Sequence, residues 1–397
     1  MRILIAHNFY QVHGGEDAVA RSETALLKDF GQEVFFYERH NDELKKLNAL
    51  EKTAHFVSLD HNRKSYELMR QEIKKVRPQV VHFHNIYYMM TPSVYQACRD
   101  EGVPVVQSLH NYRMVCSNGL LYRDGHVCED CLEKNVWEGV KHKCFRDSAL
   151  LTAMMAMSID RLWRKEIWVN LVDCYIVAAE FTGRKYADQG LPVDKIVQKP
   201  HFIHPDLGKR QINEGYALYL GRLSQEKGVD ILLEAWRSIK NIPLKIAGTG
   251  PLEQKLKAFV HSHQLTNVEF LGLLDEHQCQ QILSRAGVVL VPSVCYENFP
   301  RVVVEAFSCG VLIVASRLGS LAELIQDGQT GLLVEPGNSS QIVSAVQRCF
   351  ENKMKTVFMG DNARRVFEEK YTAQANYKRI MGIYEDVISR VSKRQSK

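Results

Sequence analysis

The amino-acid sequence predicts an α/β protein made of two doubly wound domains, in which helices cover both faces of a parallel sheet. Short apolar runs alternate with segments of helical length, and this order is typical of parallel strands joined by helices. The alternation starts near the first residue and starts again after residue 210. A chain of 397 residues is also long enough for two domains, each with its own core.

The expected strands of the first domain are Arg2–Ala6, Val34–Tyr37, Val80–Phe83, Val105–Leu109 and Cys174–Ala178. Those of the second domain are Ala217–Leu220, Leu244–Ala247, Val268–Leu271, Val288–Val291, Leu312–Ala315 and Gly331–Val334. Pro, Gly and charged residues accumulate at His204–Glu214, so we expect the domains to span residues 1–207 and 208–373. The periodicity of Gln374–Val391 predicts a helix, and residues 374–397 are expected to pack back on the first domain.

A long insertion interrupts the first domain at residues 111–147. It is too long for an ordinary connection, and it contains four spaced cysteines: Cys116, Cys128, Cys131 and Cys144. Four thiolates with this spacing could bind a structural zinc ion tetrahedrally, and unconnected loop thiols are the alternative. The apolar segment Ala149–Asn170 follows the insertion and predicts one helix.

Composition excludes several classes of protein. A net charge of +5 with a pI near 8.6 is too weakly basic for a nucleic-acid binder. No stretch approaches the ~20 apolar residues of a membrane span, and Met1 leads directly into an expected strand rather than a signal peptide. The sequence therefore predicts a cytoplasmic protein, whose ten cysteines are not expected to form a disulfide framework.

Ligands of open parallel sheets bind at the carboxyl ends of the strands, so the residues that follow each expected strand are candidates for a site. The residues at these positions that suit ligand binding are Gly14, Gly15, His110, Gly221, Arg222, Gly248 and Gly250. His82 and His84 also lie near a strand end. We expect His82 to be a hydrogen-bonded structural histidine, and both roles stay open for His84.

The segment Gly221–Gly228 combines a glycine turn with two cations, Arg222 and Lys227, ahead of an expected helix. A guanidinium and an ammonium group placed in this way suit a diphosphate, because charge-assisted hydrogen bonds contribute about 1.5–3 kcal/mol each. A solvated turn with surface cations is the alternative for this segment taken alone.

The segment Glu297–Gly310 carries a stronger signal. It follows a buried strand, and Pro300 suits the first turn of a helix whose free amides can hold a phosphate. Glu297 precedes this helix and Glu305 lies inside it. The two carboxylates can therefore accept hydrogen bonds from hydroxyl groups on different parts of one ligand.

These motifs together resemble those of the retaining glycosyltransferases of glycosyltransferase family 4, which have the GT-B fold. The motifs are the Gly221–Gly228 run, the pair Glu297 and Glu305, the Gly248-Thr249-Gly250-Pro251 segment, and Gly14-Gly15. The resemblance extends over essentially the whole chain. It implies two Rossmann-like domains that face a central cleft, with the acceptor bound by the first and the sugar nucleotide by the second.

The resemblance also implies roles for individual residues. Arg222 and Lys227 would contact the donor diphosphate, Glu305 the ribose and Glu297 the transferred sugar. The remaining implied donor-site groups are the backbone amides of Asn298 and Phe299, the glycines Gly14, Gly15, Gly221, Gly248 and Gly250, and His110 beside the donor sugar. One departure is Asn298-Phe299-Pro300, where many relatives have Gly-Phe-Gly, because proline removes one amide donor.

The implied reaction moves a sugar from a nucleoside diphosphate sugar to an acceptor hydroxyl of a glycan or lipid-linked molecule, with retention of configuration and without a catalytic metal. The implied setting is the synthesis of polysaccharide, lipopolysaccharide or glycolipid. A sugar-nucleotide epimerase or hydrolase of the same fold, or a non-catalytic nucleotide-sugar-binding subunit, is the alternative. No cofactor is expected beyond the structural zinc considered above.

Basic residues suggest a second type of partner. The cations of the segment Arg63–Arg77, the helix Ala149–Asn170 and the tail Ser392–Lys397 could contact anionic lipid headgroups. Solvated helix faces are the alternative. Peripheral contact with the inner face of the plasma membrane is therefore an expectation that accompanies the cytoplasmic location.

Overall fold

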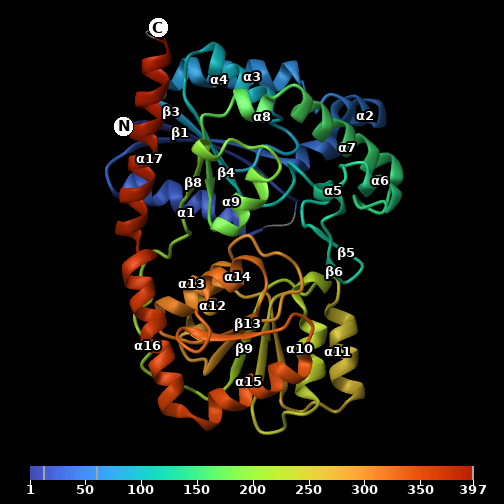
Figure 1. Ribbon diagram of the computed structural model, residues 1–397, viewed down its shortest axis with the longest axis vertical. Helices are drawn as coiled ribbons and strands as arrows, with labels where there is room; N and C mark the ends of the chain where they lie inside the picture. Colours follow the sequence, from blue (N-terminus) through green and yellow to red (C-terminus); the bar gives the residue numbers. More distant parts are fainter. Residues whose placement is uncertain (12–13, 60, 396–397) are drawn as a thin grey trace. The chain divides into compact units, whose positions relative to one another are not determined.

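The computed structural model describes residues 1–11, 14–59 and 61–395, and the last two residues of the basic tail lie outside the described part. The described chain divides into two compact units (Figure 1). Unit 1 consists of Met1–Leu121, Cys128–Pro200 and Asn376–Lys397, and unit 2 consists of Tyr122–Val127 and His201–Ala375. Each unit contains a parallel sheet covered by helices, so the predicted fold class is confirmed.

The sheet of unit 1 has the strand order β2-β1-β3-β4-β7-β8, and its pairs are parallel. The strands are β1 (Arg2–Phe9), β2 (Glu33–His40), β3 (Val80–Phe83), β4 (Val105–Leu109), β7 (Cys174–Val177) and β8 (Ile196–Gln198). Strand β8 was not predicted. It has three residues, all of them partly exposed, so the sequence shows neither an apolar run nor a clear alternation there.

The helices of unit 1 connect these strands, and two short ones, α5 and α6, lie in the insertion. They are α1 (Gly15–Asp29), α2 (Ala49–Val57), α3 (Arg63–Val76), α4 (Ser93–Asp100), α5 (Asp130–Glu133), α6 (Glu138–Lys141), α7 (Ala149–Arg164), α8 (Ile167–Asn170) and α9 (Glu180–Ala187). The prediction of one helix over Ala149–Asn170 was wrong. The chain breaks between α7 and α8 because Glu166 adopts a left-handed conformation with φ of 51°.

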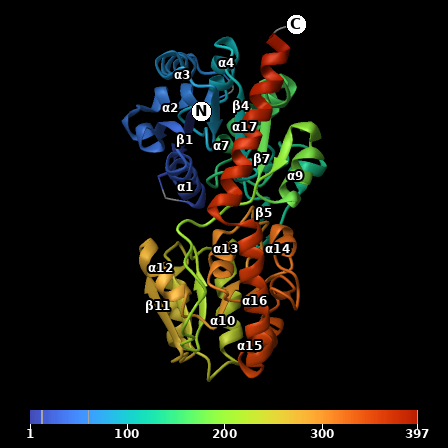
Figure 2. The same ribbon diagram turned by 90° about the vertical axis from the view of Figure 1, so that its left-hand side faces the viewer.

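The C-terminal helix α17 (Ala373–Gln395) contributes directly to the core of unit 1. Figure 2 shows α17 crossing the sheet of this unit. Its buried side chains Ile380, Ile383, Tyr384 and Val387 follow a helical repeat and pack in one cluster with residues of the central strands, among them Ile3. This segment, distant in sequence, therefore closes one face of the first sheet.

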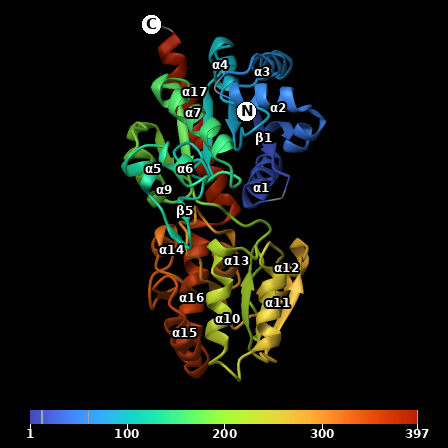
Figure 3. The ribbon, with the colours of Figure 1, turned by 90° about the vertical axis from the view of Figure 1, so that its right-hand side faces the viewer.

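The sheet of unit 2 has the order β11-β10-β9-β12-β13-β14, again with parallel pairs. Its strands are β9 (Ala217–Leu220), β10 (Leu244–Ala247), β11 (Val268–Gly272), β12 (Val288–Val291), β13 (Ile313–Ser316) and β14 (Gly331–Val334). Its helices are α10 (Val229–Trp236), α11 (Glu253–Ser262), α12 (Glu276–Leu283), α13 (Arg301–Ser308), α14 (Gly319–Leu324), α15 (Ser339–Glu351) and α16 (Lys353–Lys370). Figure 3 shows α10, α11 and α15 around these strands.

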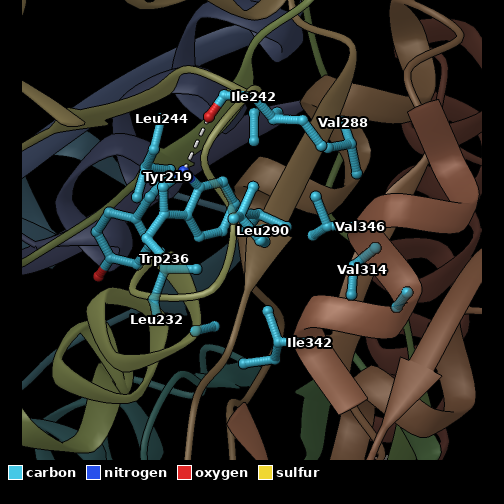
Figure 4. Packing of buried hydrophobic residues seen from close by; sticks show 14 of the residues in the cluster. Tyr219, Leu232, Trp236, Ile242, Leu244, Val288, Leu290, Val314, Ile342 and Val346 are labelled. Atoms are coloured by element: carbon cyan, nitrogen blue, oxygen red, sulfur yellow. Dashed lines mark hydrogen bonds between the residues drawn. The ribbon is translucent and has the colours of Figure 1, made fainter. Parts of the chain in front are cut away.

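Trp236 occupies the core of unit 2, where its side chain is fully buried. Its indole Nε1 donates a hydrogen bond of 3.1 Å to the carbonyl of Ile242, and aliphatic side chains such as Leu290 surround the ring (Figure 4). The polar atom of this large buried side chain is thus satisfied without water. This core fixes α10 against the sheet, and α10 directly follows the turn Gly221–Gly228.

In the parallel sheet of each unit there is one pair of neighbouring strands from which the chain continues toward opposite edges of the sheet. This pair is β1 and β3 in unit 1 and β9 and β12 in unit 2. Ligands of such sheets bind beside the carboxyl ends of these strands. Along residues 1–11, 14–59 and 61–395, no helix combines the length and the apolar character that a membrane span needs.

We predict that α17 is needed for the stability of unit 1. Replacing the fully buried Ile380 by Ala should lower the free energy of unfolding by about 2–5 kcal/mol, because it leaves a cavity beneath the helix. The exposed Glu385 on the same helix is the matched control, and Glu385→Ala should change stability by less than about 0.5 kcal/mol. Urea unfolding measures both variants, and equal stabilities would contradict the packing described here.

Candidate functional site

The turn Gly221–Gly228 lies at the carboxyl end of β9. The hydroxyl of Tyr219 donates a hydrogen bond of 2.8 Å to the carbonyl of Arg222 and holds the start of the turn. Gly228 ends the turn with φ of 67°, and a Cβ atom there would lie 2.1 Å from the carbonyl oxygen of Pro292. A side chain is therefore excluded at the residue that follows Lys227.

Gly248 and Gly250 allow the loop after β10 to pack against the same turn. A Cβ atom on Gly248, which has φ of 134°, would lie 1.9 Å from the carbonyl oxygen of Gly221. A Cβ atom on Gly250 would lie 2.4 Å from the carbonyl oxygen of Leu223. The chain's own packing thus requires glycine at both positions, whatever they contact in a ligand.

Lys227 and Glu297 form an ion pair at this edge of the sheet. The Nζ atom of Lys227 lies 2.6 Å from Oε1 of Glu297, which also accepts a 2.6 Å hydrogen bond from the hydroxyl of Ser293. Burial alone would lower the pKa of Lys227, but the Glu297 carboxylate more than offsets this and the pKa is raised. The structure therefore brings together two predicted site residues that lie far apart in the sequence, and Lys227 stays charged.

The helix α13 positions Glu305 one turn beyond its start. Burial raises the pKa of Glu305, and Arg301, whose Nη2 lies 3.5 Å from Oε1 of Glu305, opposes that shift. The side chain of Phe299 is buried against His201 and Tyr371 rather than turned toward a ligand. Only the backbone of Phe299, whose amide is the group predicted to lie near the donor sugar, is then available to a ligand.

The other predicted residues of this loop region have separate places. Arg222 is exposed in the turn, and Asn298 is partly buried just before α13. The hydroxyl of Ser320 on α14 donates a 2.6 Å hydrogen bond to the carbonyl of Glu297. Ser293 and Ser320, which the sequence did not single out, therefore fix both the side chain and the backbone of Glu297.

Gly14 and Gly15 lie at the N-terminus of α1 in unit 1. Gly14 is the N-cap, and its amide donates a 3.0 Å hydrogen bond to Oδ2 of Asp17. A Cβ atom at either glycine would meet no heavy atom within 4 Å among the described residues. The packing of the chain therefore does not explain these glycines, in contrast to Gly248 and Gly250.

His110 follows β4 and is partly exposed. Its Nε2 lies 3.0 Å from Nδ1 of His84, and the two rings stack with a centroid distance of 5.2 Å. Burial, together with the neighbouring His7 and Lys199, lowers the pKa of His110 to about 3. His110 is consequently a neutral imidazole at physiological pH, which can accept or donate a hydrogen bond but carries no charge.

The sequence motifs did not reveal a cluster of charged side chains that lies beside His110. Burial raises the pKa of Glu16 to about 7, with Arg113 opposing the shift, and Asn111 donates a 3.3 Å hydrogen bond to the Glu16 carboxylate. Arg113 bonds to the hydroxyl of Tyr88 at 2.7 Å. The positions of Glu16, one residue after the glycine pair, and of Arg113, three residues after His110, were the available signals.

The four cysteines of the insertion are only partly brought together. A hydrogen bond with the Cys131 thiol lowers the pKa of Cys116 to about 6, and Cys144 is close enough to help raise the pKa of Cys131. Within the described ranges, the four cysteines do not form a group of three with sulfur atoms all within 4.8 Å. The zinc site therefore stays a prediction, supported by the contact between Cys116 and Cys131.

Comparisons with known proteins bear on the motifs of unit 2. Residues 205–366 match the family model described as "Glycosyl transferases group 1". The O-antigen chain mannosyltransferase C of Escherichia coli is 25% identical over 232 residues, which cover 55% of this chain and 62% of that protein. The chain spans about half the length of the curated relatives it matches.

Solved structures resemble the whole chain. Sucrose-phosphate synthase from Thermosynechococcus elongatus has a TM-score of 0.74 at 20% identity and covers 98% of this chain and 100% of its own. Anabaena HepE in complex with UDP-glucose has a TM-score of 0.68 at 16% identity, with 97% and 99% covered. At these identities the likeness shows the fold, which is the predicted GT-B fold.

The turn, the ion pair and α13 all lie within the segment that the family model covers. Over residues 205–366, the chain is therefore similar to the glycosyltransferase group 1 family. The predicted resemblance to glycosyltransferases is confirmed at this level, while membership of family 4 stays a prediction.

We predict that Gly248 is required for folding of unit 2. Gly248→Ala should cost about 3 kcal/mol or more, because the new Cβ would overlap the carbonyl of Gly221 and occupy an unfavourable φ. Gly15→Ala is the control, since the space around that residue is open, and its stability should stay within about 0.5 kcal/mol of the unchanged protein. Thermal unfolding of both variants decides, and a stable Gly248→Ala variant would rule out the close contact.

We also predict about one zinc ion per chain in the insertion. Elemental analysis of protein purified without a metal-affinity tag measures it directly. Cys131→Ser should lower the zinc content, whereas Cys279→Ser, on α12 in unit 2, should leave it unchanged. Absence of zinc, with the four thiols freely titratable in the folded protein, would favour unconnected loop thiols instead.

Proposed function

We propose that the protein is a retaining glycosyltransferase that moves a sugar from a nucleoside diphosphate sugar to an acceptor hydroxyl. The observation that carries the proposal is the Lys227–Glu297 ion pair at the carboxyl edge of β9 and β12, inside the segment that is similar to the group 1 family. A cation for a phosphate and a carboxylate for sugar hydroxyls are thereby fixed side by side. HepE, a solved structure of the same fold, was crystallised with UDP-glucose.

Arg222 and Lys227 would bind the diphosphate and stabilise the charge that develops as it leaves. The raised pKa of Lys227 keeps its ammonium group protonated throughout the physiological range. The amides at the start of α13 add a partial positive charge. Two side-chain cations and a helix terminus can neutralise a diphosphate, so we propose that catalysis needs no metal ion.

Glu297 would orient the transferred sugar. Its Oε1 atom already accepts from Lys227 and Ser293, which fixes the side chain and directs Oε2 to a sugar hydroxyl. Glu305 would accept from the ribose, with Arg301 favouring its ionised form. Since configuration is retained, we propose front-face displacement in which the leaving phosphate takes the acceptor proton, and no protein nucleophile is assigned.

The acceptor would be a glycan or a lipid-linked molecule. The name of the E. coli relative, an O-antigen chain mannosyltransferase, supports a role in polysaccharide, lipopolysaccharide or glycolipid synthesis. A lipid-linked acceptor would make contact with the cytoplasmic face of the plasma membrane useful. On α3, however, Arg70 bonds to Glu101 at 2.7 Å and Lys75 to Glu72 at 3.2 Å, so part of its positive charge is already neutralised.

Incubation of the protein with radiolabelled sugar nucleotides and a lipid or glycan extract tests the proposal. Label that moves to lipid or glycan, with unchanged anomeric configuration, supports transfer. Free labelled sugar would identify a hydrolase, a changed sugar nucleotide an epimerase, and binding without turnover a non-catalytic subunit. Assays in EDTA test metal independence in the same experiment.

We predict that Arg222→Ala and Lys227→Ala each lower kcat by about 10²–10³-fold, because the charge they meet grows in the transition state. Glu305→Ala should mainly raise the donor KM, since ribose contacts change little during transfer. Lys240→Ala, which removes an exposed cation elsewhere in unit 2, is the control. Normal kcat in a folded Arg222→Ala, Lys227→Ala double variant would remove both cations from the mechanism.

A further inference from the structure

A buried ion pair lies behind His110 in unit 1. The Nζ atom of Lys199 donates to Oε1 of Glu23 on α1, and each residue is 1% exposed. The same ammonium lies 3.4 Å from Oδ1 of Asn376 on α17. Because an ammonium group only donates hydrogen bonds, Lys199 fixes which oxygen of Glu23 is left for other partners.

The second oxygen of Glu23 faces a histidine. Oε2 of Glu23 lies 3.6 Å from Nε2 of His84, and both atoms are buried without a hydrogen-bond partner elsewhere in the described part of the chain. The neighbouring His82 is already satisfied, since its nitrogens lie 2.8 Å from the hydroxyls of Tyr384 and Ser108. Two orphaned atoms that face each other across 3.6 Å are natural partners, because a buried polar group without a hydrogen bond is costly.

The chemistry of the two atoms determines the proton position. A carboxylate oxygen repels the lone pair of a bare nitrogen and attracts an N–H group, so the charge of Glu23 favours the proton on Nε2 of His84, and Nδ1 of His84 is then an acceptor. Nδ1 of His84 lies 3.0 Å from Nε2 of His110, and such a pair of nitrogens needs one proton between them. His110 must supply it, which leaves its own Nδ1 without a proton.

Both rings are neutral, as this arrangement requires. Burial lowers the pKa of His84 well below its usual value, with the nearby His82 and His110 acting in the same direction. The pKa of His110 is lowered to about 3. Each ring therefore carries one proton, and the position of that proton is set by its partners.

The cluster of Glu23, His82 and His84 has the composition of a metal site, and its ligand atoms lie within 4.8 Å of one another. Two features argue against a metal ion there. The Lys199 ammonium already occupies the position of a cation beside the Glu23 carboxylate. Both nitrogens of His82 are engaged by hydroxyl groups, so only one histidine is left to bind metal.

We propose that Glu23 and His84 are positioning residues that hold His110 in its Nε2–H tautomer. The effect of this tautomer on sugar transfer rests on the proposed function, whereas the tautomer itself does not. Lys199 orients Glu23, Glu23 orients His84, and His84 orients His110. The relay joins residues of α1 and α17 to residues that directly follow β3, β4 and β8, and all of these residues belong to unit 1.

Nitrogen-15 NMR of the histidine-labelled full-length protein tests the tautomer directly. The signals of His110 are assigned by their loss in His110→Asn. Nε2 should show the shift of a protonated nitrogen and Nδ1 that of a bare one, at neutral pH and without ligand. A proton on Nδ1 of His110 would overturn the proposal, as would one bound metal ion per chain that is lost in His84→Asn.

The isosteric change Glu23→Gln tests the relay. Lys199 should donate its hydrogen bond to the carbonyl oxygen of the new Gln side chain. The amide NH₂ would then face Nε2 of His84, which must accept, so the His84 proton would move to Nδ1. Nε2 of His110 would then become an acceptor, and the His110 proton would move to Nδ1. An exposed carboxylate of the same unit supplies the control, and Glu33→Gln should leave the His110 signals unchanged.

Measurements of sugar transfer distinguish the proposed relay from the proposed function. Glu23→Gln should lower kcat/KM for transfer by about 10–100-fold, as when a partner that orients a metal-binding histidine is lost. An unchanged His110 tautomer in a folded Glu23→Gln protein would contradict the relay. If Glu23→Gln does not fold, the His110 tautomer measured in the unchanged protein still tests the proposal. The predicted tautomer in a protein that transfers no sugar would refute the proposed function and leave the relay standing.

Discussion

Three backbone contacts too close for a side chain hold together the loops at the carboxyl ends of β9, β10 and β12 in unit 2. Gly228 meets the carbonyl of Pro292, Gly248 meets that of Gly221, and Gly250 meets that of Leu223. They join the turn after β9 to the loops after β10 and β12. Lys227 immediately precedes the first of these contacts, so its reach to the carboxylate after β12 depends on them. The glycines of the motif thus act first through packing, and any contact with a ligand is built on that packing.

The two units place different chemistry at the same edge of similar sheets. In unit 2 the edge presents cations, because Arg222 is exposed there and the Glu297 carboxylate raises the pKa of Lys227. In unit 1 the edge presents the neutral imidazole of His110, and the buried Glu23 and Lys199 behind it neutralise each other. A diphosphate needs the first environment, whereas a sugar, rich in hydroxyl groups, needs the second. The two edges differ because the charges behind His110 are buried together as a pair, whereas the cations of unit 2 lie at the edge itself.

Much of the fold could be predicted from sequence, because continuous apolar runs mark buried parallel strands such as β7 and β12. The candidate site could be located as loops at the strand ends, but its pairings could not. Lys227 and Glu297 are 70 residues apart, and Glu23 and Lys199 are 176 apart, so only the topology brings each pair together. Strand β8 and the break between α7 and α8 lack a local signal, since packing and one left-handed residue decide them.

The central claim is that the carboxyl edge of unit 2 binds a nucleoside diphosphate. Titration of the full-length protein with pairs of nucleoside diphosphates and monophosphates, followed by its melting temperature, tests it most directly. A ligand at a hundred times its Kd stabilises the folded protein by about 2.7 kcal/mol, which is readily measured. At least one diphosphate should raise Tm, and the monophosphate of the same base should raise it much less. Equal effects of the two, or no shift with any diphosphate, would contradict the claim.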